Sequence, residues 1–329
     1  MTVPADPERR HGILAVDSGG SGLRVAVGTA GAGALAGRSS PVPVRTGERG
    51  IDPGDLMDRL VPMVRALTAE TGVAGLTTAV VGAAGLATLG DGLRAELPDA
   101  LTRAFGVRTT ALAADAVTAY TGALGARPGA VVAAGTGLIA IGTDLTGWQR
   151  ADGWGHLLGD CGGGAWIGRA GLEAALRAHD GRPGGSARLL ARAEERFGPV
   201  PGLPGRLYPR PDRAAVLASF APDVAACAAH DPVASDILRA AAGHIAESAA
   251  AVCPPDGNPP FALTGGLVGL GEPLLVPLAE EVARLLPHAR RVEAEGDPLH
   301  GGVRIAADLA EGRLALPVDG LLLSVTRRT

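Results

Sequence analysis

The sequence predicts an α/β fold that is divided into two domains. A strand-turn-strand unit with a tip of glycine and hydroxyl residues occurs twice, over Gly12–Gly28 and over Ala130–Gly142. Segments with strand and helix patterns alternate around these units, which indicates duplicated βββαβα halves. The chain has 329 residues, more than one hydrophobic core normally organises, so two cores are expected.

We expect residues 1–117 to form the N-terminal domain and residues 118–299 to form the C-terminal domain with a helical insertion. Residues 300–329 would return as a helical segment to complete the first domain. After the second hairpin the pattern is mostly helical, and the expected helices are Ala165–His179, Asp212–His230, Pro232–Val252 and Leu299–Glu311.

In the first domain, Asp52 and Pro53 are typical of a helix start, and Gly72 of the same helix's end. Thr77–Val81 and Thr109–Ala113 have the pattern of buried strands. Further predicted elements are the helix Ala116–Leu124 and the strand Phe261–Thr264.

Composition excludes several classes of function. The net charge of −4 gives no electrostatic basis for binding nucleic acid or an anionic membrane. No apolar run is long enough to span a bilayer, and the N-terminal segment has no apolar signal region. The 3 cysteines form no CxxC pair, which favours a reducing compartment, so we expect a cytoplasmic protein.

All 30 basic residues are arginine, so the chain contains no lysine. A Walker A lysine, the strand lysine of protein kinases and a Schiff-base lysine are therefore excluded. If this chain binds ATP, backbone amides, hydroxyls, carboxylates and a metal ion must hold it.

The first turn has the groups that a phosphate site without lysine needs. Glycines let backbone N–H groups approach phosphate oxygens, and serine hydroxyls can donate to them. The candidate phosphate ligands are Ser18, Gly19, Gly20 and Ser21. Asp17, at the end of a buried strand, is the candidate ligand of Mg²⁺, directly or through water. The alternative is a tight hairpin with an acceptor aspartate.

The second turn, Gly135, Thr136 and Gly137, repeats this arrangement. Two such tips in one chain favour a pair of opposed phosphate clamps over two unrelated turns. Gly265 and Gly266 follow a strand and would let a flat adenine ring lie against the backbone. Together these residues predict ATP as cofactor.

Asp115 lies between a predicted strand and a helix N-terminus. The helix dipole there favours the carboxylate form, which a general base for a hydroxyl nucleophile requires. The alternative role is that of a helix N-cap.

The segment Asp152–Gly168 combines polar and aromatic residues with seven glycines, which suits a ligand-binding loop. Asp160 is the candidate ligand contact, since a carboxylate can accept from two sugar hydroxyls. The other candidate substrate contacts are Asp152, Trp154, Gly155 and His156. His156 can also be a structural histidine bonded to backbone, and Trp166 is expected in the core.

The ordered motifs DSGGSGLRVAV, AADAVTAY, AAGTGLIAIG, GWGHLLGDCGGGAWIG, LTGGLVG and DPLHGGVRIA resemble those of the N-acetylglucosamine kinase-like family. This family also contains ATPase activators of dehydratases and belongs to the actin-like ATPase and sugar kinase superfamily. The resemblance implies two actin-like domains with an interdomain cleft, ATP with Mg²⁺, and transfer of the γ-phosphoryl group to a sugar 6-hydroxyl. It also implies a homodimer with a small amino sugar as substrate and no nucleic-acid or membrane partner.

Carried over by residue, the resemblance implies Asp17 near Mg²⁺, Asp115 as the base and Asp160 on ring hydroxyls. It places Gly20, Ser21, Gly135, Thr136 and Gly137 at phosphates and Gly265 and Gly266 at the nucleoside.

The chain departs from the family pattern at Leu138, where serine is usual, at Cys161, where glutamate is usual, and at Gly163, where serine is usual. Because the sugar motif is altered and Asp152 adds an acid, we expect glucosamine as substrate in preference to N-acetylglucosamine. The rival functions are an iron–sulfur ATPase activator of a dehydratase, which needs thiolates at a dimer seam, and a sugar-binding regulator without catalysis.

Overall fold

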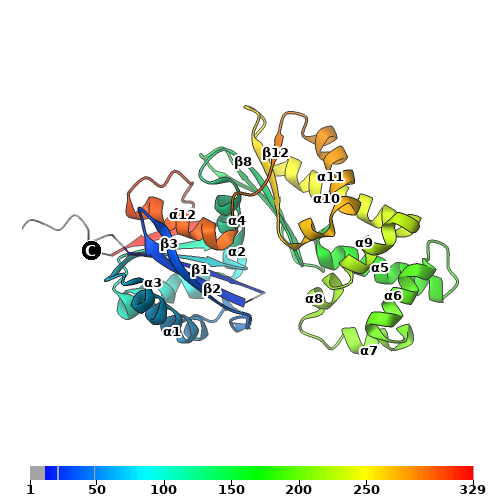
Figure 1. Ribbon diagram of the computed structural model, residues 1–329, viewed down its shortest axis with the longest axis horizontal. Helices are drawn as coiled ribbons and strands as arrows, with labels where there is room; N and C mark the ends of the chain where they lie inside the picture. The colour runs from blue at the N-terminus through cyan, green and yellow to red at the C-terminus, as the bar shows by residue number, and fades with distance from the viewer. Residues whose placement is uncertain (1–11, 21, 48, 329) are drawn as a thin grey trace, which may run out of the picture. The chain divides into compact units, whose positions relative to one another are not determined.

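The computed structural model describes residues 12–20, 22–47 and 49–328, which form two compact units (Figure 1). Unit 1 contains the described residues up to 128, residues 143–148, and those from 294 onward; unit 2 contains residues 129–142 and 149–293. These bounds differ from the sequence-based ones because helix α4 (Asp115–Leu124) packs against helix α12 (Pro298–Ala310), and both belong to unit 1.

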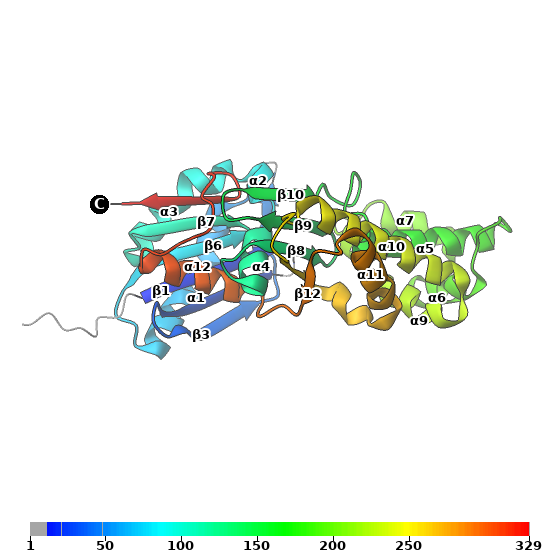
Figure 2. The same ribbon diagram turned by 90° about the horizontal axis from the view of Figure 1, so that it is seen from above.

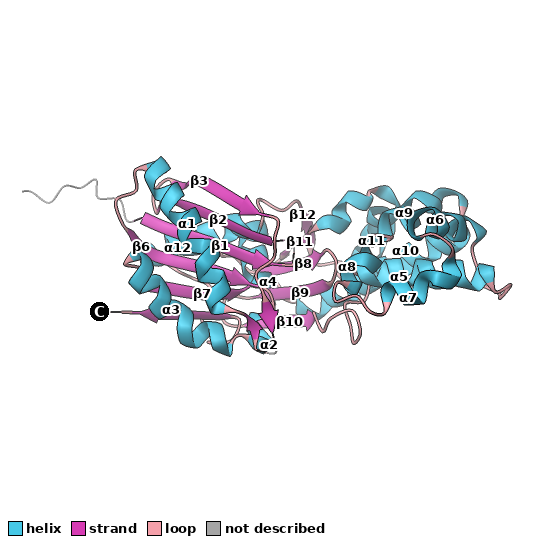
Figure 3. Ribbon diagram, turned by 90° about the horizontal axis from the view of Figure 1, so that it is seen from below, coloured by secondary structure: helices cyan, strands magenta, loops and turns pink. Residues whose placement is uncertain are grey.

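Unit 1 is built on a six-stranded sheet with the order β13-β7-β6-β1-β2-β3 (Figure 3). The strands are β1 (Gly12–Gly19), β2 (Gly22–Thr29), β3 (Gly33–Ser40), β6 (Leu76–Ala83), β7 (Thr109–Ala114) and β13 (Leu323–Arg327). β1, β6 and β7 are parallel, whereas β2 and β13 pair antiparallel with β1 and β7. The returning C-terminal segment is therefore a helix, α12, followed by a strand, β13, that completes the sheet. The prediction that residues 300–329 are helical throughout is wrong for the part that forms β13.

Helices cover both faces of this sheet, α4 and α12 on one and α1 (Pro53–Thr71) and α3 (Asp91–Phe105) on the other (Figures 1 and 2). The predicted start and end of α1 are confirmed. The Asp52 side chain accepts from the Asp55 N–H at 3.0 Å, and Gly72 ends the helix with φ 68°. The buried residues Leu56, Leu60, Val64 and Leu67 form one face of α1.

Side chains of β1 alternate between these two faces. Leu14 and Val16 pack in the hydrophobic cluster that includes the buried face of α1. Ala15 faces α12, since a β-carbon added to Gly302 would lie 3.3 Å from the Ala15 Cβ. Asp17 follows on the α12 side, at the end of the strand.

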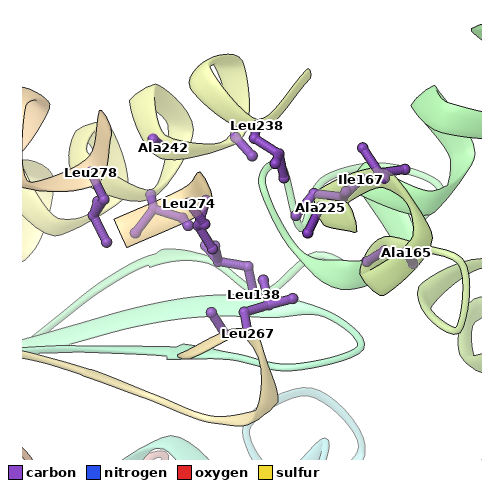
Figure 4. Packing of buried hydrophobic residues seen from close by; sticks show 14 of the residues in the cluster. Leu138, Ala165, Ile167, Ala225, Leu238, Ala242, Leu267, Leu274 and Leu278 are labelled. Carbon is purple, nitrogen blue, oxygen red and sulfur yellow. The ribbon is translucent and has the colours of Figure 1, made fainter. Parts of the chain in front are cut away.

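Unit 2 contains a five-stranded sheet with the order β10-β9-β8-β11-β12. Its strands are β8 (Gly129–Ala134), β9 (Leu138–Thr143), β10 (Trp148–Asp152), β11 (Pro260–Thr264) and β12 (Arg290–Val292). Figure 4 shows Leu138 and Leu267 next to each other, with Leu274 of helix α11 (Glu272–Leu285) above them, in the cluster that joins this sheet to its helices. The predicted α/β fold with a sheet in each half is thus confirmed.

The helical part of unit 2 comprises α5 (Gly164–His179), α6 (Ala187–Phe197), α7 (Leu203–Leu207), α8 (Arg213–Ala218), α9 (Ala221–Cys227) and α10 (Pro232–Val252). The single helix expected over residues 212–230 is wrong. α8 and α9 are separate, and a 3₁₀ turn, Ala228–His230, follows them. Pro222 lies in the first turn of α9, where its missing N–H favours a new helix start over continuation.

The remaining elements are short. They are the hairpin strands β4 (Thr46–Gly47) and β5 (Gly50–Ile51), helix α2 (Leu86–Leu89), and the 3₁₀ turns Val200–Gly202 and Gly266–Leu270. None of the helices in the described part of the chain has the length and hydropathy of a membrane span.

Candidate active site

Three parallel strands of unit 1 end at one edge of its sheet. Asp17 of β1 is in register with Gly82 of β6, which is in register with Ala113 of β7. Asp115 follows β7 directly, so the candidate base Asp115 and the candidate metal ligand Asp17 both lie along this edge. A β-carbon added to Gly82 would lie 2.9 Å from the Thr118 side chain, which shows how closely α4 approaches β6.

Asp115 is the first residue of α4 and is half-buried, so the predicted junction of strand and helix is confirmed. The Ala116 N–H donates to its Oδ1 at 2.9 Å, and the Thr118 hydroxyl donates to its carbonyl oxygen at 2.9 Å. Backbone N–H groups and the helix dipole favour the ionised carboxylate at this position. The side chain can therefore accept a proton, and its role as a base stays a prediction.

The Asp17 carboxylate forms an ion pair that the sequence analysis missed. Arg24 Nε and Nη2 donate to Asp17 Oδ2 at 2.9 and 2.7 Å, and Arg24 Nη1 donates to Asp297 Oδ2 at 2.7 Å. Burial lowers the pKa of the Arg24 guanidinium, but its bonds to Asp17 and Asp297 raise that pKa by more, so the net shift is upward. The hairpin register, which pairs Asp17 with Arg24, was the available signal for the first contact.

Residues of the first turn differ in exposure. Ser18 is 1% exposed, and its hydroxyl has no hydrogen-bond partner among the described residues. Strand alternation places it on the face opposite to Asp17. β-carbons added to Gly19 and Gly20 would meet nothing within 4 Å, so space is open beside this backbone. Ser21 lies outside the described residues.

The second turn packs against the start of α5 in unit 2. The Gly164 and Ala165 N–H groups donate to the Gly135 and Thr136 carbonyl oxygens, each at 2.8 Å. Within the turn, the Gly135 N–H donates to the Gly137 carbonyl oxygen at 2.9 Å. Thr136 is exposed at the tip, where its hydroxyl can reach a ligand.

The turn at Gly265 and Gly266 lies beside this second glycine turn, because β11 and β8 pair in parallel. Gly265 has φ 98°, and a β-carbon there would overlap the Ala134 carbonyl oxygen. Both glycines are exposed, and the space next to Gly266 is open. The structure thus brings the predicted phosphate residues of the second turn and the predicted nucleoside residues together within unit 2.

Asp160 is turned into the loop that carries it. It is 8% exposed and has φ 54°; its Oδ1 accepts from the Gly155 N–H at 2.9 Å, and its Oδ2 lies against Gly137. Burial raises the pKa of the Asp160 carboxyl, and the Gly155 hydrogen bond offsets only part of this rise. Asp160 therefore connects the predicted sugar motif to the second glycine turn.

Asp152 also organises this loop. Its carboxylate accepts from the N–H groups of Asp160 at 2.6 Å and Cys161 at 3.0 Å. Trp154 is 62% exposed, and the Arg150 guanidinium carbon lies 4.7 Å from its ring centroid. His156 is half-buried, and Trp166 contacts His244 edge-on with 5.1 Å between ring centroids. The loop therefore presents Trp154, while its two acids bind the loop backbone.

The groups present fit a magnesium nucleotide. The space beside Gly19, Gly20 and Gly135 is open, and the Arg24 bonds to Asp17 use only Oδ2. No cluster of three or more His, Cys, Asp or Glu side chains suited to a metal occurs among the described residues. Mg²⁺ needs none, since one carboxylate with phosphate oxygens and waters commonly holds it.

Comparison with known proteins shows the family. The profile of the BadF/BadG/BcrA/BcrD ATPase family matches residues 14–301. The chain belongs to this family. Membership confirms the resemblance inferred from the motifs and assigns ATP as the nucleotide.

Solved structures share the fold of this family member. A candidate N-acetylglucosamine kinase from Chromobacterium violaceum has a TM-score of 0.69 and 25% identity, over 90% of this chain and 98% of the other. A glucokinase of the ROK family from Streptomyces griseus, solved with glucose and AMPPNP, has a TM-score of 0.55 and 22% identity, over 92% and 99% of the two chains.

A curated relative matches over a shorter region. The N-acetylmuramic acid/N-acetylglucosamine kinase of Clostridium acetobutylicum is 42% identical over 69 residues, which are 21% of this chain. The match spans 22% of the length of that relative.

Proposed function

We propose that this ATPase-family member is a sugar kinase that transfers the γ-phosphoryl group of ATP to the 6-hydroxyl of an amino sugar. The observation that carries the proposal is the placement of Asp115 and Asp17 along one sheet edge of unit 1, at the ends of parallel strands. Carboxyl ends of such strands are the usual place for ligands in α/β sheets.

Asp115 would accept the proton of the 6-hydroxyl as that oxygen attacks phosphorus. Its position at the N-terminus of α4 supports this role, because the helix dipole stabilises a carboxylate that is ready to accept. Water must be kept from this group during the reaction, since water would compete with the sugar as acceptor.

The two glycine turns would hold the phosphates, with the exposed Thr136 hydroxyl as a donor and Gly265 and Gly266 beside the nucleoside. Asp17 would hold Mg²⁺, through Oδ1 or through water. When bound, the magnesium nucleotide supplies the phosphoryl group and a metal that neutralises its charge. The chain's own contribution is positioning and charge stabilisation, which suits a protein without lysine.

The finer proposal is glucosamine with a free amine. Asp152, which the family pattern lacks, lies with Asp160 in the loop of the sugar motif, and negative charge favours a cationic amine. Their hydrogen bonds to the loop backbone mean that they act as local charge more than as dedicated ligands. N-acetylglucosamine is the second candidate, favoured by the names of the Clostridium and Chromobacterium relatives.

A coupled ADP-release assay over a panel of sugars tests this function. We expect sugar-dependent ADP release and a 6-phosphate product identified by mass spectrometry and NMR. ADP release without any sugar dependence would contradict the kinase proposal and leave the ATPase family assignment in place.

A further inference from the structure

One guanidinium in unit 1 serves two carboxylates that are far apart in sequence. Arg24 binds Asp17 through Nε and Nη2, and it binds Asp297 through Nη1 at 2.7 Å, across 273 residues. The side chains are 14% exposed at Asp17, 34% at Arg24 and 54% at Asp297. The pair with Asp17 is therefore the more buried one, and the pair with Asp297 is closer to solvent.

The charges of this trio bear on metal binding. An arginine that pairs only with Asp17 would cancel the charge of the carboxylate proposed for magnesium, and a cationic neighbour repels a divalent cation. With Asp297 included, two carboxylates share one guanidinium, and the trio keeps a net charge of about −1 at neutral pH.

Both carboxylate oxygens of Asp297 accept hydrogen bonds. Its Oδ1 accepts from the His300 N–H at 2.9 Å as N-cap of α12, and Oδ2 is the oxygen that accepts from Arg24. Its backbone also lies against α4, since a β-carbon on Gly122 would overlap the Asp297 carbonyl oxygen. The two carboxylate oxygens thus have two separable tasks.

We propose that Asp297 is a positioning residue that acts through Arg24 and keeps Asp17 able to serve Mg²⁺. Asp297 accepts a hydrogen bond from Arg24 Nη1. Its negative charge offsets part of the positive charge of the guanidinium, so Arg24 neutralises Asp17 less completely. The proposal rests on the placement of Mg²⁺ at Asp17, which is part of the proposed function. It adds a role for the DPLHGG segment, in which the sequence indicates no chemistry.

The variant Asp297→Asn separates the two tasks, because asparagine caps helices about as well as aspartate but carries no charge. Glu70→Gln is the matched control. It removes the acidic partner of Arg38: Glu70 of α1 pairs with Arg38 of β3 at 3.1 Å, on the face of the sheet opposite to Asp17. Neither variant should lower the melting temperature by more than about 2 °C.

Calorimetric binding of ADP across a magnesium titration, without sugar, is the readout. For Asp297→Asn we expect the magnesium concentration at half-maximal binding to rise about two- to fivefold, the range for a partly exposed charge pair. Binding of metal-free ATP should be unchanged or tighter. Glu70→Gln should match the wild-type protein in both measurements.

Arg24→Gln completes a double-mutant cycle. If Asp297 acts through Arg24, Asp297→Asn should change the magnesium requirement less in the Arg24→Gln background than alone. An unchanged requirement in Asp297→Asn, or an equal shift in both backgrounds, would overturn the proposal. If ADP binding to the wild-type protein does not depend on magnesium, both this proposal and the placement of Mg²⁺ at Asp17 are overturned. If the wild-type protein phosphorylates no sugar, only the kinase proposal is overturned.

Discussion

The Asp160 carboxylate lies against Gly137, so that the predicted sugar motif and the second glycine turn form one structural piece in unit 2. A β-carbon on Gly137 would overlap Asp160 Oδ2, while Oδ1 accepts from the Gly155 N–H. The glycine at this position is therefore required by a side chain of the same site, and neither Gly135 nor Gly137 has a positive φ.

This contact predicts different results for two glycines of one turn. Gly137→Ala should destabilise the protein by about 1–3 kcal/mol, because the methyl group must displace the buried Asp160 carboxylate. Gly135→Ala should change stability by less than about 0.5 kcal/mol, since a β-carbon there meets nothing within 4 Å. Urea unfolding of both variants measures the difference.

If phosphate occupies the open space at Gly135, the added methyl group should weaken ATP binding at least about tenfold, or about 1.4 kcal/mol. Equal stability of the two variants would contradict the contact between Asp160 and Gly137. Unchanged nucleotide affinity of Gly135→Ala would contradict the phosphate assignment of this turn.

Asp115→Asn should fold and bind nucleotide but lose phosphoryl transfer by roughly a hundredfold or more, which is the contribution of a positioned general base. Asparagine preserves the shape of the side chain and cannot take the proton. The control is Asp91→Asn, since Asp91 is likewise an acidic residue in the first turn of a helix of unit 1. A near-normal turnover number for Asp115→Asn, with the control also active, would exclude the base role.

The parts of this fold that depend on local patterns could be predicted from the sequence. Both hairpins, helix α1 and the junction at Asp115 follow from glycine turns, a cap and the spacing of apolar residues. Strand β13 could not, because its residues have no informative pattern, and only pairing with β7, which lies far earlier in the chain, makes them a strand.

The candidate site also divides into residues that a local pattern indicates and contacts that depend on residues far apart in the chain. Asp17 and the glycine turns are visible within a few consecutive residues. The bond between Arg24 and Asp297 joins positions 273 residues apart, and no short pattern reports it. The inward turn of Asp160 depends on a left-handed backbone and on burial by Gly137, which sequence alone could not show.

Asp17→Ala should mainly weaken the use of magnesium and ATP, while sugar binding without nucleotide survives. The reason is that Asp17 lies at the first turn with Arg24, whereas the proposed sugar contacts are Asp115 and Asp160. Calorimetry with ATP and with sugar, each alone, gives the two affinities. Loss of sugar binding with nucleotide binding intact would reverse this assignment of the site.

The interactions of the Asp55 carboxylate should make the stability of the folded protein depend on pH. The Arg45 N–H, which donates at 2.9 Å, and the Arg59 guanidinium hold the pKa of the Asp55 carboxyl below its usual value. A carboxyl with a lowered folded-state pKa stabilises the fold at pH values above the unfolded-state pKa of about 3.9, and this stabilisation is lost as pH falls through the folded-state value.

The variant Asp55→Asn should therefore melt at a lower temperature than the wild-type protein at pH 7, and the difference should shrink below about pH 4. The exposed Asp58 of the same helix provides the control Asp58→Asn. A difference in melting temperature that stays constant from pH 7 to pH 3 would show that charge is not the cause.

The choice between glucosamine and N-acetylglucosamine is the sharpest test of the proposed substrate. An N-acetyl group needs an apolar slot for its methyl and partners for its amide, whereas a free amine is largely cationic near neutral pH and prefers negative surroundings. Here the loop carries Asp152 and Asp160, and Cys161 and Gly163 replace the usual glutamate and serine. The negative charge of these two acids would attract an ammonium, whereas a neutral acetamide would gain nothing from it. We expect kcat/KM for glucosamine to exceed that for N-acetylglucosamine at least about tenfold, which corresponds to about 1.4 kcal/mol. Equal or faster turnover of the acetylated sugar would refute this preference and leave the kinase assignment intact.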